Sequence, residues 1–189
     1  MMTEDLTELK KEFDRLIRDT GRINAEKVLS HLEQIGFYTA PASRKDHLGC
    51  EGGLLQHSFN VYQMACLVWR QLAAIRPMDD VTHDNIVIAS LLHDICKARR
   101  YVRQPDGSYE KTYSDFPAGH GEKSVIMLLR LGFPLTESEI LAIEYHMGPF
   151  RIPLHSEEAD KDYRAACTSS PLVPIIHTAD TLAAQVIEV

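Results

Sequence analysis

The chain has 189 residues, of which 44% are hydrophobic and 25% are charged, and this composition fits one globular domain and excludes a disordered chain. No apolar run approaches the roughly 20 residues that span a bilayer, and a net charge of −7 argues against holding long nucleic acid by its phosphates. The first residues lack a secretory signal, and the four cysteines form no Cys-x-x-Cys pair, so we expect a cytoplasmic protein without disulfides or a thiolate zinc site.

The first forty residues predict two helices. Apolar residues recur there at helical spacing at Leu6, Leu9, Phe13 and Leu16, and a second periodic segment follows at 24–35. We assign 1–40 to an N-terminal helical extension and 41–189 to the core of the same single domain.

Two apolar helices are expected in the middle of the fold, at 54–75 and 85–97. In the first, apolar residues cover nearly every face, which is typical of a central, buried helix. The second is more apolar still and carries the adjacent pair His93 and Asp94 in its last turns.

The remaining chain predicts one hairpin and four more helices. Aromatic and polar residues alternate from Tyr101 to Tyr113 around a turn at Pro105–Gly107, which is the only strand signal in the sequence. The predicted helices are 121–131, 137–147, 156–166 and 173–189. The expected fold class is all-α, a helical bundle with one short β-hairpin.

Side chains that commonly bind metals occur on five of the predicted elements: His57, His93, Asp94, His120, His146 and Asp180. Four imidazoles and two carboxylates exceed what one tetrahedral site uses, so they indicate two divalent ions that share a carboxylate. Neighbouring residues on a helix point about 100° apart, so Asp94 can lie between the ions while His93 holds one of them. Iron, manganese, nickel, cobalt, zinc and magnesium stay open, because ligand type alone does not choose among them.

A single-ion site is the alternative. It would use His57, His93, Asp94 and Asp180, and His120 and His146 would then contact substrate.

The expected reaction is phosphate ester hydrolysis, because two ions about 3.5 to 4 Å apart can hold a bridging hydroxide and clamp phosphate oxygens. Asp94 is a catalytic candidate as the bridge. Lys97 is another, since it follows His93 by one helical turn and could stabilise phosphate charge or, alternatively, only complement the helix dipole. Basic residues that could also contact a substrate phosphate are Arg44, Lys45, His47 and Arg151, although a solvated loop is the alternative for them.

Three further polar residues are expected beside the ligands. Gln56 and Glu122 flank ligand histidines and could orient imidazoles, as metal-bound histidines usually require. His177 lies one turn before Asp180 and is expected to support the site from the core.

Five stretches of this sequence resemble the HD-domain metal-dependent phosphohydrolases, a family named for its His-Asp pair: GGLLQHSFNV, LLHDICK, GHGEKS, EYHMG and HTADTLA. The resemblance covers roughly residues 47–184 and is to the binuclear branch of the family. It implies a first ion held by His57, His93, Asp94 and Asp180, and a second held by Asp94, His120 and His146.

We therefore expect a metal-dependent phosphohydrolase, a phosphomonoesterase or phosphodiesterase, that hydrolyses a nucleotide or related small phosphorylated molecule through a metal-bridging hydroxide. Two alternatives stay open: a di-iron oxygenase of the HD fold, and a regulatory module that binds a nucleotide without turnover. No stable nucleic-acid complex and no membrane association are expected, and the sequence defines no oligomeric state.

Overall fold

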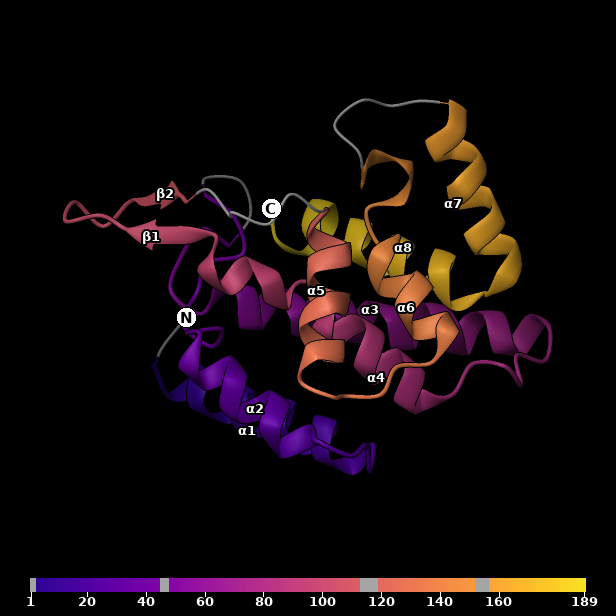
Figure 1. Ribbon diagram of the computed structural model, residues 1–189, viewed down its shortest axis with the longest axis horizontal. Coiled ribbons are helices and arrows are strands. Elements are labelled where there is room, and N and C mark those ends of the chain that lie inside the picture. The colour runs from indigo at the N-terminus through magenta and orange to yellow at the C-terminus, as the bar shows by residue number, and fades with distance from the viewer. Residues whose placement is uncertain (1–2, 45–47, 113–118, 152–156) are drawn as a thin grey trace.

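The fold was analysed in a computed structural model, which describes residues 3–44, 48–112, 119–151 and 157–189, and within these ranges every side chain except those of 3–5, 120, 150 and 151. The described chain contains eight α-helices and one two-stranded antiparallel hairpin (Figure 1). The predicted fold class is confirmed.

Helices α1 (Thr3–Asp19) and α2 (Ala25–Gln34) form a pair that packs below the other helices in Figure 1. Their apolar faces are buried, with Phe13 and Val28 fully enclosed, and α1 contacts both α3 (Gly53–Ile75) and α4 (His83–Leu92). The amphipathic pattern of the extension therefore reflects packing onto the central pair.

Helix α4 is the most enclosed element of the described chain. A capping box at Thr82 and Asn85 starts it, and its residues Asn85 to Leu92 are all buried. It packs against α3, α6 (Glu137–Glu144) and α8 (Leu172–Leu182), which explains why apolar residues occur on all of its sides.

Helix α3 differs from the prediction of a helix buried along its whole length. Its first half is buried, but nearly every residue from Leu67 to Ile75 is exposed, and those two side chains are 52% and 82% accessible. The end of α3 extends past its neighbours (Figure 1), and of its apolar residues only Val68 and Trp69 pack, partly buried, against the core.

Three helices end earlier than predicted: α4, α6 and α8, whose α-helical part stops at Leu182 and not at 189. Helix α4 stops at Leu92, because Asp94 leaves the helical conformation at φ −115° and ψ 15°, and a 3-10 segment, η1 (Ile95–Arg99), follows. Helix α6 similarly stops at Glu144, where Tyr145 adopts φ −100° and ψ 15°. The predicted ligands His93, Asp94 and His146 therefore lie in turns directly after helices.

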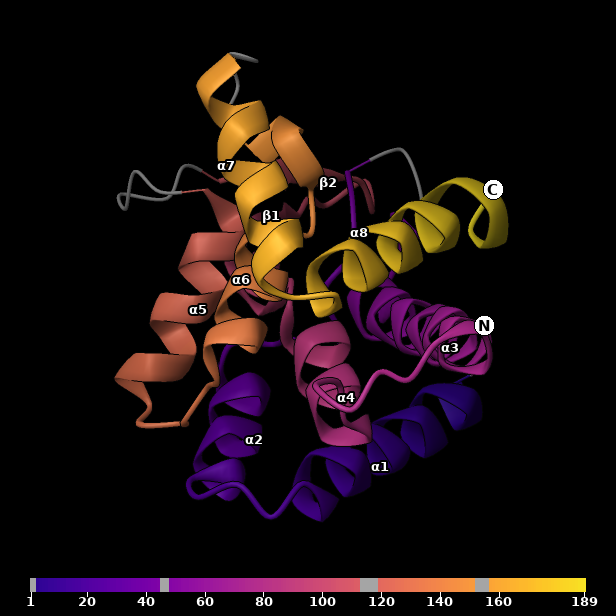
Figure 2. The same ribbon diagram turned by 90° about the vertical axis from the view of Figure 1, so that its right-hand side faces the viewer.

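The remaining elements pack chiefly on α6, α8 and η1 (Figure 2). They are β1 (Tyr101–Arg103) paired with β2 (Tyr109–Lys111), α5 (His120–Arg130), the 3-10 segment η2 (Gly148–Arg151), and α7 (Glu157–Ser169). Helix α8 continues directly into a π-helical segment, η3 (Ala183–Ile187). None of the helices in the described ranges combines the length and apolarity needed to cross a membrane.

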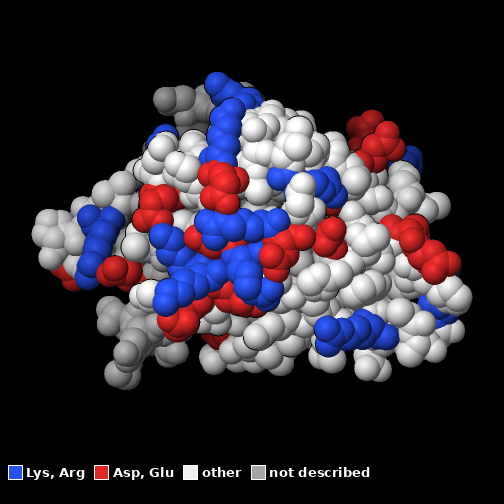
Figure 3. Space-filling model, turned by 90° about the horizontal axis from the view of Figure 1, so that it is seen from below, with Lys and Arg blue, Asp and Glu red and all other residues white. Residues whose placement is uncertain are grey.

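The face formed by α1 and α2 carries positive and negative side chains side by side (Figure 3). Arg15 pairs with Glu12 at 2.6 Å, and Arg18 pairs with Glu26 at 2.6 Å. The described residues of this face therefore do not form a basic surface of the kind that long nucleic acid requires.

Candidate metal centre

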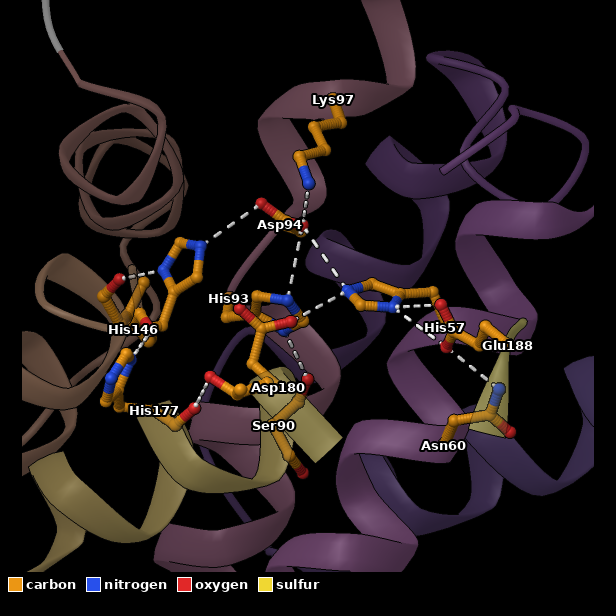
Figure 4. Close-up of polar contacts among 12 residues, drawn as sticks. His57, Asn60, Ser90, His93, Asp94, Lys97, His146, His177, Asp180 and Glu188 are labelled. Carbon is orange, nitrogen blue, oxygen red and sulfur yellow. Dashed lines mark hydrogen bonds and ion pairs between the residues drawn. The ribbon is translucent and has the colours of Figure 1, made fainter. Parts of the chain in front are cut away.

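Five of the six predicted ligand side chains meet in one cluster inside the bundle (Figure 4): His57, His93, Asp94, His146 and Asp180. They come from α3, the turn after α4, the turn after α6, and α8. Four of them are almost completely buried, and the side chain of Asp180 is 14% exposed. Helix α5 begins at the sixth, His120, whose side chain lies outside the described part of the chain.

The two carboxylate oxygens of Asp94 face different histidines. Oδ2 lies 3.2 Å from Nε2 of His93 and 3.7 Å from Nε2 of His57, whereas Oδ1 lies 3.5 Å from Nε2 of His146. A carboxylate in this position can bind two ions, one on each oxygen.

The three imidazoles are held by their Nδ1 atoms. His93 donates to the carbonyl oxygen of Ser90, and His146 to that of Ile143, both at 2.7 Å, while Nδ1 of His57 lies 3.0 Å from Glu188. A carbonyl or carboxylate oxygen accepts a hydrogen, so Nδ1 carries a proton in each ring and Nε2 is the atom directed at the cluster. A metal ligand needs this orientation, with Nε2 free of a proton once the ion is bound.

The early helix ends explain why His93 and His146 adopt this orientation. The last carbonyl groups of an α-helix lack partners within the helix. In both turns, the ring of the histidine bonds the carbonyl three residues before it. The same local contact thus satisfies the helix end and aims Nε2 into the core.

The carboxylates of the cluster are held in their charged form. Burial alone would raise the pKa of Asp94, but Lys97 and His93 outweigh burial and hold that pKa well below the usual range. Burial also opposes ionisation of Asp180, whose pKa is nevertheless lowered, chiefly by its hydrogen bond with His57. Two buried anionic side chains in one cluster suit a divalent cation.

Two histidines of the cluster, His57 and His146, differ in their pKa. Burial lowers the pKa of His146 to about 4, despite the attraction of Asp94. Burial likewise acts to lower the pKa of His57, but hydrogen bonds with Asp180 and Glu188 reverse the effect and raise it to about 9. A metal ion must therefore displace a proton from Nε2 of His57.

Lys97 contacts the cluster even though α4 ends before it. The 3-10 turn of η1 places its ammonium 2.5 Å from Oδ2 of Asp94, and its side chain is 13% exposed. Burial opposes its charge, but Asp94 prevails and the pKa of Lys97 is raised. A cation therefore lies directly beside the cluster.

The donor atoms fit a metal ion. Within the described residues, His57, His93 and Asp94 form one group, and His93, His146 and Asp180 another, and the ligand atoms of each group lie within 4.8 Å of one another. Nε2 of His93 is buried and makes no hydrogen bond to a described residue. Imidazole and carboxylate together suit iron, manganese, cobalt, nickel or zinc.

Of the predicted substrate contacts, only Lys97 and Arg44 have described side chains. Arg44 is exposed on the loop before α3. Lys45 and His47 lie outside the described residues, as does the side chain of Arg151.

The supporting residues differ in part from those expected. His177 donates from Nδ1 to the carbonyl oxygen of His146 at 2.7 Å and so supports the site. Glu122 accepts a hydrogen bond from the backbone of Gly119 at the start of α5. Gln56 reaches the ring of His57 only through Asn60 and Glu188.

Sequence reasoning missed Glu188, which contacts His57 across 131 positions of the chain. The one signal available was an isolated acidic residue in an apolar C-terminal segment, and such a residue is ordinarily solvent-exposed.

The helices of this bundle direct histidines and aspartates to one buried point. This arrangement is that of helical metal-binding domains. The chain belongs to the HD domain family, whose match covers residues 54–185 and includes every ligand candidate.

One curated relative is the dihydroneopterin 2',3'-cyclic phosphate phosphodiesterase of Methanocaldococcus jannaschii, which is 34% identical to this chain over 103 residues. The aligned part covers 54% of this chain and 41% of the relative, so the chain spans less than half the length of that protein. No solved structure matches the chain.

Proposed function

We propose that this protein is a metal-dependent phosphohydrolase that cleaves a phosphoester bond in a small phosphorylated molecule. The observation that carries the proposal is the convergence of three imidazole Nε2 atoms and two carboxylates on one buried point beside a lysine ammonium. Membership of the HD domain family and the phosphodiesterase relative support it.

We assign the ligand set to two ions. His57, His93 and Asp180 would hold the first together with Oδ2 of Asp94, and Oδ1 of Asp94 would hold the second together with His146. We assign His120, at the start of α5, to the second ion as well. When bound, such ions supply Lewis-acid stabilisation of phosphoryl oxygens and lower the pKa of a water molecule.

The residues around the ligands prepare the site for an anionic substrate. The carbonyl oxygens of Ser90 and Ile143 hold His93 and His146 in one orientation, so the ligands are positioned before substrate arrives. The ammonium of Lys97 lies at the edge of the cluster, where it can compensate the negative charge that develops on a phosphate. Lys97 and Asp94 are therefore the catalytic residues of the proposal.

We further propose a phosphodiesterase that opens a cyclic phosphate of a nucleotide or a related small molecule. The activity for which the relative is named, cleavage of a 2',3'-cyclic phosphate, supports this choice over phosphomonoesters. Arg44, Lys45, His47 and Arg151 are the proposed additional contacts to the substrate.

The test is hydrolysis by protein that has been stripped of metal and reloaded with one divalent metal at a time. The substrates are a 2',3'-cyclic nucleotide, a linear dinucleotide and a phosphomonoester. We expect opening of the cyclic phosphate, and a loss of at least about 100-fold in kcat for His93→Ala and Asp94→Ala. His83→Ala, which alters an exposed histidine on α4, is the matched control. Absence of both bound metal and hydrolysis with every metal would contradict the proposal.

The same preparation distinguishes the two alternatives. Oxygen consumption by iron-loaded protein without phosphate ester cleavage would indicate a di-iron oxygenase. Tight nucleotide binding without product would indicate a regulatory module.

A further inference from the structure

Both ring nitrogens of His57 contact carboxylates from one continuous element, α8 with η3 (Figure 4). Nε2 lies 3.2 Å from Oδ1 of Asp180, and Nδ1 lies 3.0 and 3.1 Å from the two oxygens of Glu188. One element therefore carries a candidate ligand and a partner for another ligand.

The π-helical turn of η3 makes this double contact possible. In a regular α-helix, the eight steps from Asp180 to Glu188 would rotate the second side chain about 80° away from the first. The wider turn, closed by a 3.0 Å bond from the amide of Glu188 to the carbonyl of Ala183, winds less per residue and returns Glu188 to the face of Asp180. Such turns are rare in proteins as a whole, but those that occur are often found at functional sites.

From Val186 to Val189, the burial pattern is the reverse of what the hydrophobic effect favours. Val186, Ile187 and Val189 are 60%, 50% and 94% exposed, whereas the side chain of Glu188 is only 1% exposed. Apolar burial therefore does not explain why the segment lies here. A buried carboxylate is costly unless polar contacts compensate it, so its contacts must hold it in place.

Those contacts come from one face of α3. The amide nitrogen of Asn60 donates to Glu188 at 2.9 Å, and Gln56, one turn earlier, donates to the amide oxygen of Asn60 at 2.9 Å. The Gln56 contact fixes the orientation of the Asn60 amide, so that its nitrogen faces Glu188. The carboxylate is thus held in position on the side of His57 away from the cluster.

We propose that Glu188 is a positioning residue of the metal centre: it accepts the Nδ1 proton of His57, fixes the ring with Nε2 toward the ion, and makes the imidazole a stronger ligand. Carboxylates with this role typically change metal affinity 10- to 100-fold. The inference rests on the proposed function only in requiring a bound metal, and it does not depend on the reaction.

The test compares Glu188→Gln, Glu188→Ala and Asn60→Ala with the wild-type protein. The glutamine variant can still accept the proton but lacks the charge, and Asn60→Ala removes only the support of Glu188. Glu158→Gln makes the same charge change at an exposed position of α7 and is the matched control. The measurements are stoichiometry and Kd for Mn²⁺ and Co²⁺, the visible spectrum of bound Co²⁺, and thermal unfolding of the metal-free proteins.

We expect Kd to rise about 100-fold in Glu188→Ala, about tenfold in Glu188→Gln and less in Asn60→Ala, with an altered Co²⁺ spectrum in the alanine variant. Glu158→Gln should match the wild type. Should Glu188→Ala fail to fold, Glu188→Gln decides through its Kd and spectrum. Wild-type Kd and spectrum in the folded Glu188 variants would overturn the inference.

Tight metal binding that needs Glu188, in a protein that cleaves no phosphoester, would refute the proposed reaction and leave this inference intact.

Discussion

At the residue scale, we expect protons and metal ions to compete for Nε2 of His57. In the metal-free site its pKa is about 9, against 6.5 for a free histidine. Below pH 9 a bound metal must therefore release this proton, and we expect the affinity for Mn²⁺ to rise about tenfold per pH unit between pH 7 and 9. Titration calorimetry in buffers of different ionisation enthalpy measures the protons released.

For the metal-free protein, the raised pKa of His57 affects stability, and in the opposite direction with pH. A pKa that is raised on folding stabilises the folded state fully below about pH 6.5, and this contribution is lost as the pH rises through 9. Metal-free protein should lose stability over that window while metal affinity increases. A metal affinity that does not change between pH 7 and 9 would contradict the assignment of His57 as a ligand.

The ammonium of Lys97 is expected to act on substrate charge and not as a metal ligand. We predict that Lys97→Met lowers kcat for the cyclic phosphate about 100-fold while the number of bound ions stays the same. Lys161→Met, an exposed lysine on α7, should keep wild-type activity. Steady-state kinetics with metal analysis measures both, and full activity of Lys97→Met would remove this residue from the mechanism.

At the scale of elements, a buried polar group joins the N-terminal extension to the core. Glu139 of α6 is completely buried, accepts from Arg22 at 2.7 Å and from Asn85 of α4 at 2.9 Å, and closes the cap of α6 with Thr136. Three elements therefore depend on one carboxylate.

We predict that Glu139→Ala lowers the free energy of unfolding by about 3 kcal/mol, because it leaves a largely buried arginine and a buried amide without their acceptor. Glu137→Ala, in the same helical turn but exposed, should change it by less than about 0.5 kcal/mol. Urea unfolding of both variants measures the difference. Equal stabilities would show that Arg22 and Asn85 find other acceptors.

The order of the elements could be predicted from apolar periodicity, and so could the hairpin, because both depend on local sequence. The helix ends near Asp94 and Tyr145 could not, since the ring contacts of His93 and His146 and the packing around them favour an early end over continued helical propensity. The exposed half of α3 was missed because an apolar pattern does not identify what covers it.

The candidate site, too, could be predicted from the sequence only in part. Five ligand candidates were found by residue type and order, and the structure brings them together. Glu188 was missed because its role depends on a π turn and on a contact with α3, which no local pattern encodes. The roles of these five residues as ligands, and the assignments of His120, Lys97, Arg44, Lys45, His47 and Arg151, stay predictions.

At the scale of the whole molecule, the centre exists only when distant parts of the chain are packed together. Its described ligand candidates span residues 57 to 180 and lie on α3, α8 and the turns that follow α4 and α6. The unfolded chain therefore has no preformed site, and metal binding should stabilise the fold as a unit.

The most direct measurement is anomalous X-ray scattering from crystals grown with Mn²⁺. We predict one peak within ligand distance of His57, His93, Asp94 and Asp180, and a second beside His146 and Oδ1 of Asp94. A single peak would restrict the centre to one ion. No peak within the cluster, in protein that binds Mn²⁺ elsewhere, would contradict the account.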